Sequence, residues 1–236
     1  MKTASLILAA GCLLAQAPKV TVHTQVREDI FAGFLVNDLA RFETGVARLD
    51  RMLAEDRNNA AALAWRGGAE LYLAVRSHEA GRHEEFAERH VRAMEWMEQA
   101  LRLGPQNVGV LATAGASIIL FADRLPADRR AAALKQGRAA FLELEKLQKP
   151  FLDRMPLHMR GELLAGLAQA AERLGYAAEA KAYLTRIVET MPGTPYESRA
   201  RKWLDQPALA RKGNLVCQTC HEPGRLENVL KAGGTR

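Results

Sequence analysis

Residues 60–105 read AAALAWRGGAELYLAVRSHEAGRHEEFAERHVRAMEWMEQALRLGP, and they contain the clearest periodicity in the chain. In the first half, large apolar side chains recur at the spacing of a helix, at Leu63, Trp65, Leu71, Tyr72 and Val75. The second half continues with good helix formers until Pro105, and proline is not tolerated in the interior of a helix. The segment therefore predicts two helices followed by a turn.

The same pattern recurs four times along the chain, which is the signature of a repeat architecture. Each second helix carries a small residue, an apolar residue four positions later and another three positions after that: Gly45, Leu49 and Met52; Ala93, Met97 and Ala100; Gly137, Phe141 and Leu144; Ala180, Leu184 and Ile187. Each first helix has a glycine at a similar place, at Gly33, Gly68, Gly115 and Gly166. A turn follows each unit, at Asn58-Asn59, Pro105, Pro150 and Pro192. We expect these small residues to allow close approach between helices.

The pattern resembles the tetratricopeptide repeat, and the second unit matches it best. That unit has the motif residues Trp65, Gly68, Tyr72, Ala93, Ala100 and Pro105. The resemblance covers residues 26–205 and implies an all-α solenoid of about four helical hairpins. Units two and three are about ten residues longer than a standard repeat. The additional residues lie around 78–88 and 121–130.

A further helix is expected at the end of the solenoid. Thr194 can cap it, Pro195 suits its first turn, and Glu197 would complete a capping box. Such a helix would cover the exposed apolar side of the fourth unit, as a solenoid requires. Residues 206–214 are interpreted as a linker, and residues 215–236 as a tail that this linker tethers to the repeats.

The composition favours a folded, helical and exported protein. Apolar residues make up 48% of the chain and charged residues 25%, which is typical of a packed domain. Although the net charge is +6, the basic residues are interleaved with acidic ones, so no nucleic-acid partner is expected. Residues 1–17 resemble a signal peptide, with Lys2, a short apolar core and an A-x-A site. That core is too short to span a bilayer.

The N-terminal region also permits a second interpretation. The residues up to Cys12 loosely resemble a lipoprotein box, in which this cysteine would be lipidated. Both alternatives predict a periplasmic or secreted protein. Residues 18–25 are interpreted as a lead-in without clear periodicity. No transmembrane segment is expected in the rest of the chain.

The tail contains the motif that carries chemistry, Cys217-Gln218-Thr219-Cys220-His221. The C-x-x-C-H spacing is typical of covalent haem attachment. Cys217 and Cys220 would form thioethers with the haem, and His221 would be the proximal iron ligand. A structural zinc site needs four ligands, and no second ligand pair is found. A thioredoxin-like redox pair should follow a strand, and none is expected.

The second axial ligand is not evident from the sequence. Only fifteen residues follow His221, and none is methionine or histidine. The ligand must therefore come from the helical body or another subunit, or be absent. The candidates in the body are His23, His78, His83, His90, His158, Met155, Met159 and Met191. Met52, Met94 and Met97 lie at repeat core positions and are interpreted as packing residues.

Two functions of different classes follow from this sequence. The first is a monohaem c-type electron-transfer protein whose repeats dock a protein partner on a concave face. The second is a periplasmic or lipid-anchored scaffold for protein–protein interaction with no redox role. A peroxidase-like activity would require five-coordinate iron. No catalytic constellation is found outside the haem motif.

Overall fold

The computed structural model describes residues 21–210 and 213–216, and every regular element within them is a helix. The elements are α1 (Val22–Val36), α2 (Leu39–Glu55), α3 (Ala60–Glu79), α4 (His83–Leu103), α5 (Val108–Ala122), α6 (Ala127–Gln148), the 3-10 helix η1 (Lys149–Arg154), α7 (Leu157–Arg173), α8 (Ala177–Thr190), α9 (Pro195–Asp205) and α10 (Pro207–Ala210). The all-α class is therefore confirmed. Across these same residues, no helix has both the length and the apolar character that crossing a membrane requires.

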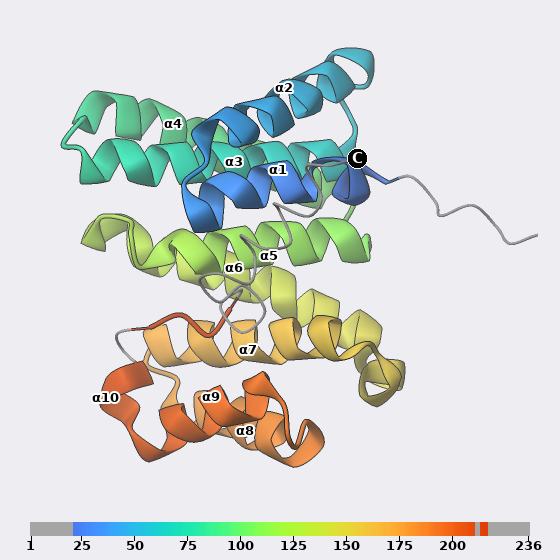
Figure 1. Cartoon of the computed structure of the whole chain (residues 1–236), viewed down its shortest axis with the longest axis vertical. Helices are drawn as coiled ribbons and strands as arrows, with labels where there is room; N and C mark the ends of the chain where they lie inside the picture. The colour runs from blue at the N-terminus through green and yellow to red at the C-terminus, as the bar shows by residue number, and fades with distance from the viewer. Residues whose placement is uncertain (1–20, 211–212, 217–236) are drawn as a thin grey trace, which may run out of the picture.

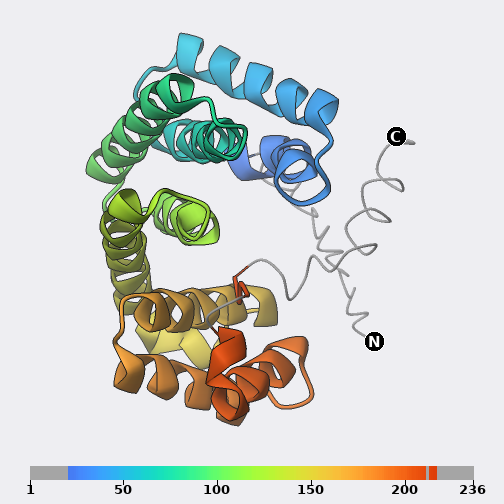
Figure 2. The same ribbon diagram turned by 90° about the vertical axis from the view of Figure 1, so that its left-hand side faces the viewer.

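Helices that are adjacent in sequence form pairs, and the pairs are stacked. α1 packs on α2, α3 on α4, α5 on α6, and α7 on α8. Figure 1 shows the pairs stacked along the longest axis of the molecule. Figure 2 shows that the stack is curved, with α1, α3, α5 and α7 on its inner side and α2, α4, α6 and α8 on its outer side. We call the side lined by α1, α3, α5 and α7 the inner face.

Glycines at the helix crossings allow the pairs to pack closely. A Cβ on Gly115 would lie 2.3 Å from Phe141, and one on Gly166 would lie 2.0 Å from the same ring. The ring of Phe141 in α6 is thus inserted between α5 and α7. A Cβ on Gly33 would likewise lie 2.6 Å from Phe42. The prediction that small residues permit close approach is confirmed at these three glycines.

The first helix begins earlier than expected, at Val22 instead of Val26. Thr21 is its N-cap, and the Thr21 hydroxyl accepts a hydrogen bond from the Thr24 N–H at 3.2 Å. The Thr24 hydroxyl in turn accepts from the Thr21 N–H at 2.9 Å. This reciprocal capping box satisfies N–H groups at the helix terminus that otherwise have no partner. Hydrophobic periodicity does not reveal it, because caps act through single polar residues.

The additional residues of the longer units are mainly helical. α3 and α4 have 20 and 21 residues, compared with 15 and 17 in α1 and α2. Only residues 80–82 connect α3 to α4. In the next unit, α6 has 22 residues, and η1 follows it before α7. The extra length therefore extends the helices more than the turns between them.

The expected terminal helix is α9, and it packs against α8 and α7. Thr194 caps it by accepting from the Glu197 N–H at 3.3 Å. Glu197 does not complete the expected capping box, because its carboxylate accepts from the Gly193 N–H at 2.5 Å. Gly193 itself has a φ of +73°, a left-handed conformation that glycine adopts without strain. Tyr196 and Trp203 of α9 are buried against the body.

Candidate functional site

The C-x-x-C-H motif, for which the sequence predicts haem attachment, lies outside the described residues. Cys217, Cys220 and His221 all follow Val216, which is the last residue that the structure describes. The expected signal peptide and Cys12 also lie outside them. The described part of the site is therefore the segment that leads directly into the motif. We call residues 213–216 the anchor segment.

A buried glutamine on α7 holds the backbone of the anchor segment. The Gln169 side chain is fully buried, and its Oε1 accepts hydrogen bonds from the Leu215 N–H at 2.6 Å and the Val216 N–H at 3.1 Å. Its Nε2 donates to Asn214 Oδ1 at 2.7 Å. A buried amide group has to satisfy both its donor and its acceptor, and this one does so with the anchor segment.

Two arginines add contacts to the same segment. Arg173 Nη2 donates to the Gly213 carbonyl at 2.7 Å, and its Nε donates to Asp123 Oδ2 at 2.8 Å. The Arg173 guanidinium also lies 5.6 Å from the ring centre of Trp203. Arg199 of α9 donates to the Asn214 carbonyl at 3.4 Å. The anchor segment is thereby connected to α5, α7 and α9 together.

The side chains of the anchor segment belong to the main hydrophobic core. Leu215 and Val216 are both 0% exposed. Full burial of such side chains contributes about 1.5–3 kcal/mol each. Figures 1 and 2 show the segment beside α7, on the inner side of the stack. The residue before Cys217 is therefore fixed in the body.

This arrangement differs from the simple linker that the sequence predicts over residues 206–214. Pro207–Ala210 form the short helix α10, and residues 213–214 are held by Gln169, Arg173 and Arg199. The attachment motif thus follows a docked segment, not a free tether. Proline and glycine in this stretch indicate irregular backbone, but they carry no information about the buried amide 45 residues earlier that binds it.

One candidate iron ligand, His158, takes part in a hydrogen-bonded chain between α7 and α9. Its Nδ1 lies 3.3 Å from the hydroxyl of Tyr196, which donates to Glu162 Oε1 at 2.8 Å. His158 itself is exposed, whereas Tyr196 is 1% exposed. The ring is therefore held from one side by a buried tyrosine.

His23 on α1 lies toward the same region of the molecule. Its ring centre is 5.6 Å from that of Trp65, and its Nε2 lies 3.4 Å from Arg27 Nη1. Burial lowers the pKa of His23, and the positive charge of Arg27 lowers it further. The charge of His158 also contributes to lowering this pKa.

The other histidine candidates gather around Phe86 at the α3–α4 turn. The ring of Phe86 lies 5.2 Å from that of His78 and 5.5 Å from that of His90, and the rings of His78 and His83 are 6.3 Å apart. Burial lowers the pKa of His90, and Arg129 lowers it further. In the described part of the chain, no three histidine, cysteine or acidic side chains converge to hold a metal ion.

The methionine candidates differ in accessibility. Met191 is 1% exposed and forms part of the core. Met155 packs against the core at the end of η1, and Met159 is 44% exposed near the start of α7. Met155 and Met159 therefore lie close to His158 along the chain. Met191 could bind a haem iron only if the core around it rearranged.

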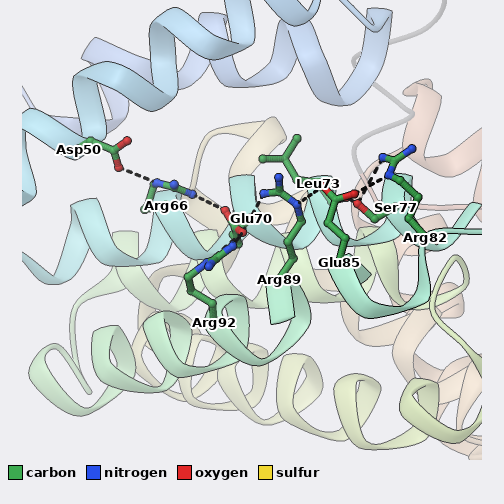
Figure 3. A network of polar contacts seen from close by, with 9 residues as sticks. All are labelled: Asp50, Arg66, Glu70, Leu73, Ser77, Arg82, Glu85, Arg89 and Arg92. Carbon is green, nitrogen blue, oxygen red and sulfur yellow. Dashed lines mark hydrogen bonds and ion pairs between the residues drawn. The ribbon is translucent and has the colours of Figure 1, made fainter. Parts of the chain in front are cut away.

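The sequence analysis missed a buried charge cluster between α3 and α4 (Figure 3). The Glu70 side chain is 1% exposed and accepts from Arg66 at 2.8 Å, from Arg89 at 3.0 Å and from Arg92 at 2.5 Å. Arg66 continues the network to Asp50 at 2.7 Å. The sequence signal was an acidic residue within the apolar run 67–75. Because its partners are all protein side chains, the cluster joins α2, α3 and α4 to one another.

The chain matches no family model, no curated protein and no solved structure.

Proposed function

We propose that this chain is an exported monohaem c-type protein whose tail exchanges electrons with a protein partner. The observation that carries the proposal is the position of the motif. C-x-x-C-H begins directly after Val216, whose side chain is fully buried. A haem attached there would stay close to the inner face, because the preceding residues are held by Gln169. Its distance to a partner docked on the body would therefore vary little.

The residues present fit a covalent haem. Cys217 and Cys220 would form the thioethers and His221 would supply the proximal imidazole. The haem supplies one-electron redox chemistry when bound. The described residues contribute a docked approach to the motif and, at His158, an imidazole held by Tyr196. These contacts support the proposal, because a docked approach would hold an attached haem closer to the body than a free linker would.

The helix pairs are, in this proposal, tetratricopeptide-like repeats that form a solenoid and dock the partner on the inner face. Support comes from the stacked pairs and from the glycine–phenylalanine contacts between them. Residues 1–17 would direct export, with lipidation of Cys12 as the alternative N-terminal processing. The partner would be a protein and not a nucleic acid, since basic and acidic residues are interleaved.

Haem attachment can be tested directly. The full chain is expressed in a bacterial host together with a cytochrome c maturation apparatus. We expect a coloured protein whose haem remains attached after denaturation and acid–acetone extraction. The paired substitution Cys217→Ala with Cys220→Ala should abolish this covalent haem. A colourless wild-type protein, or haem retention in the double variant, would contradict the proposal.

The curved stack of helix pairs also favours a second function, a scaffold without redox role. A truncation after Val216 distinguishes the two, because it removes the motif and keeps the anchor segment in the core. A scaffold would capture its partner equally well after truncation. If capture persists but electron exchange with the partner is lost, both functions hold. If wild type and truncated protein behave identically in every assay, the redox role is wrong.

A further inference from the structure

Large apolar side chains are exposed together at the connection between α6 and α7. Among the described residues, six large apolar side chains are exposed, and three of them, Phe151, Leu157 and Met159, fall within nine positions of the chain. Their exposed fractions are 44%, 41% and 44%. Single exposed apolar residues are ordinary, but a group of them marks a surface that binds something apolar. We call residues 149–160 the η1–α7 turn.

The backbone of the η1–α7 turn is held in place. Leu152 in η1 is 1% exposed and fixes the turn in the core. Arg160 Nη1 donates to the Asp153 carbonyl at 2.9 Å, which joins η1 to the first turn of α7. Pro150 and Pro156 restrict the backbone further, because the proline ring fixes φ. The exposed side chains are therefore presented by an ordered segment.

The first turn of α7 extends beyond the helices around it. Leu157, His158 and Met159 are all exposed, although they follow one another directly. Three successive helical residues point in directions that cover more than half of the helix circumference, so a turn packed on the body would bury at least one of them. Figure 1 shows the yellow connection between α6 and α7 at the right-hand edge of the stack.

Basic residues accompany the apolar ones. Lys149 and Arg154 are both exposed in η1. Residues 149–160 contain these two and Arg160 as basic residues and only Asp153 as an acidic one, which gives a net charge of +2. The surface layer of a bilayer complements this combination, because acyl chains accept apolar groups and anionic headgroups attract lysine and arginine. The core of a protein interface is instead depleted of lysine.

We propose that the η1–α7 turn is a membrane-binding site for bilayers that contain anionic lipid. Phe151, Leu157 and Met159 enter the boundary between headgroups and acyl chains, and Lys149 and Arg154 bind headgroup phosphates. The inference goes beyond the proposed electron transfer and does not depend on the haem. Binding through this turn is reversible, because stable anchoring of a protein to a membrane takes a second signal.

The apolar contribution is tested by co-sedimentation with vesicles of phosphatidylcholine mixed with phosphatidylglycerol. The full chain is used with Cys12→Ser, so that lipidation cannot add an anchor, and without haem maturation. Phe151→Ser should weaken binding about four- to twelvefold, because about half of a buried apolar side chain's contribution is lost. The control is Val91→Ser on α4, whose side chain is 55% exposed, and its binding should be unchanged. Circular dichroism checks that both variants are folded.

The charge contribution is tested with Lys149→Gln combined with Arg154→Gln. Each basic residue near an anionic surface strengthens binding about fivefold, so the pair should weaken it about twenty-five-fold. On vesicles of phosphatidylcholine alone, the same variant should bind like the wild type. The control combines Lys135→Gln and Lys181→Gln, at exposed lysines of α6 and α8, and should leave binding unchanged. Added salt should weaken wild-type binding to the anionic vesicles.

Insertion of the turn is measured with Phe151→Trp in the same full chain. Lipids brominated along the acyl chain should quench the fluorescence of the new tryptophan. The wild type is the reference, and its Trp65 and Trp203 are buried in the body, 5% and 7% exposed. Quenching no stronger in Phe151→Trp than in the wild type would show that the turn stays outside the bilayer.

Every outcome decides for or against the membrane site. It is overturned if the wild type does not bind anionic vesicles, or if Phe151→Ser and Val91→Ser bind equally well. If vesicles are not bound and Phe151→Ser abolishes a dimer in analytical ultracentrifugation, the turn is an interface between two copies of the chain. Absence of covalent haem in the matured protein would contradict the proposed function alone, since vesicle binding is measured without haem.

Discussion

Replacement of Gln169 by leucine should release the anchor segment without unfolding the body. Leucine keeps nearly the same volume but cannot accept hydrogen bonds. The Leu215 and Val216 N–H groups, both in fully buried residues, would lose their acceptor. Each unsatisfied buried group costs about 1–3 kcal/mol, so the docked state would be destabilised by about 2–6 kcal/mol.

The rest of the anchor segment cannot compensate for this loss. Burial of Leu215 and Val216 contributes about 3–6 kcal/mol in total. Ordering the backbone of four residues costs about 1–2 kcal/mol each, or about 4–8 kcal/mol. These two contributions nearly cancel, so docking depends on the hydrogen bonds to the segment, of which those from Gln169 are the buried ones and those from Arg173 and Arg199 the remainder. We expect local release and not a defective core.

Amide hydrogen exchange of the segment around residues 213–216 measures this equilibrium. A loss of 2 kcal/mol corresponds to about thirty-fold faster exchange at Leu215 and Val216. The control is Gln148→Leu, because Gln148 is a second buried glutamine (3% exposed), at the end of α6, and among the described residues it forms no hydrogen bond with the anchor segment. Exchange in the control should be unchanged. Unaltered protection in Gln169→Leu would refute the reasoning.

Three further predictions concern the body. Glu70→Gln should lower the free energy of unfolding by about 3 kcal/mol, because it leaves three arginines without their shared buried carboxylate. Asp50→Asn, at the 53% exposed end of the network, should lower it by less than about 1 kcal/mol. Urea unfolding of both variants measures the difference, and equal effects would contradict the prediction. Burial raises the pKa of Glu70, but the hydrogen bonds from Arg66 and Arg92 lower it more, so the folded pKa lies below the unfolded one. The stabilisation from the Glu70 carboxylate is thus complete above its unfolded pKa of about 4.3 and is lost as the pH falls through its folded pKa. The difference in unfolding free energy between wild type and Glu70→Gln should therefore narrow from pH 7 to pH 3. A constant difference would argue against this prediction. Gly166→Ala should lower the free energy of unfolding by about 3 kcal/mol, because its Cβ would lie 2.0 Å from the ring of Phe141. Gly109→Ala, whose Cβ would meet only an atom at 3.4 Å, should be neutral or slightly stabilising. Thermal unfolding measures both variants, and similar losses of stability in the two would be inconsistent with the packing described.

Hydrophobic periodicity was sufficient to predict the helices, and the recurring small residues were sufficient to predict where neighbouring helices pack closely. Apolar positions such as Leu49, Met97 and Ile187 are buried as the pattern implies. Helix ends were predicted less well. The N-terminal boundary of α1 depends on Thr21 and Thr24, and a capping box of two threonines leaves no trace in an apolar pattern.

For the candidate site, the sequence predicts only the covalent chemistry, and that stays a prediction. The spacing of Cys217, Cys220 and His221 is a local property, and two thiols with an adjacent imidazole indicate haem attachment wherever they stand in a fold. The sequence also identified His158 as one of several candidate histidines. It could not show that the ring lies beside the hydroxyl of Tyr196, because Tyr196 is 38 residues away in the chain.

By itself, then, the sequence determined the helical class and the repeated glycines, and it predicts haem attachment in the tail, because each depends on residues a few positions apart. The tertiary structure decided that residues 213–216 are docked and that Glu70 is shared among three arginines. It also brought His158, Glu162 and Tyr196 together. Hydrogen bonds and ion pairs of this kind act over about 3 Å, and residues far apart in the chain come that close only when the helices pack.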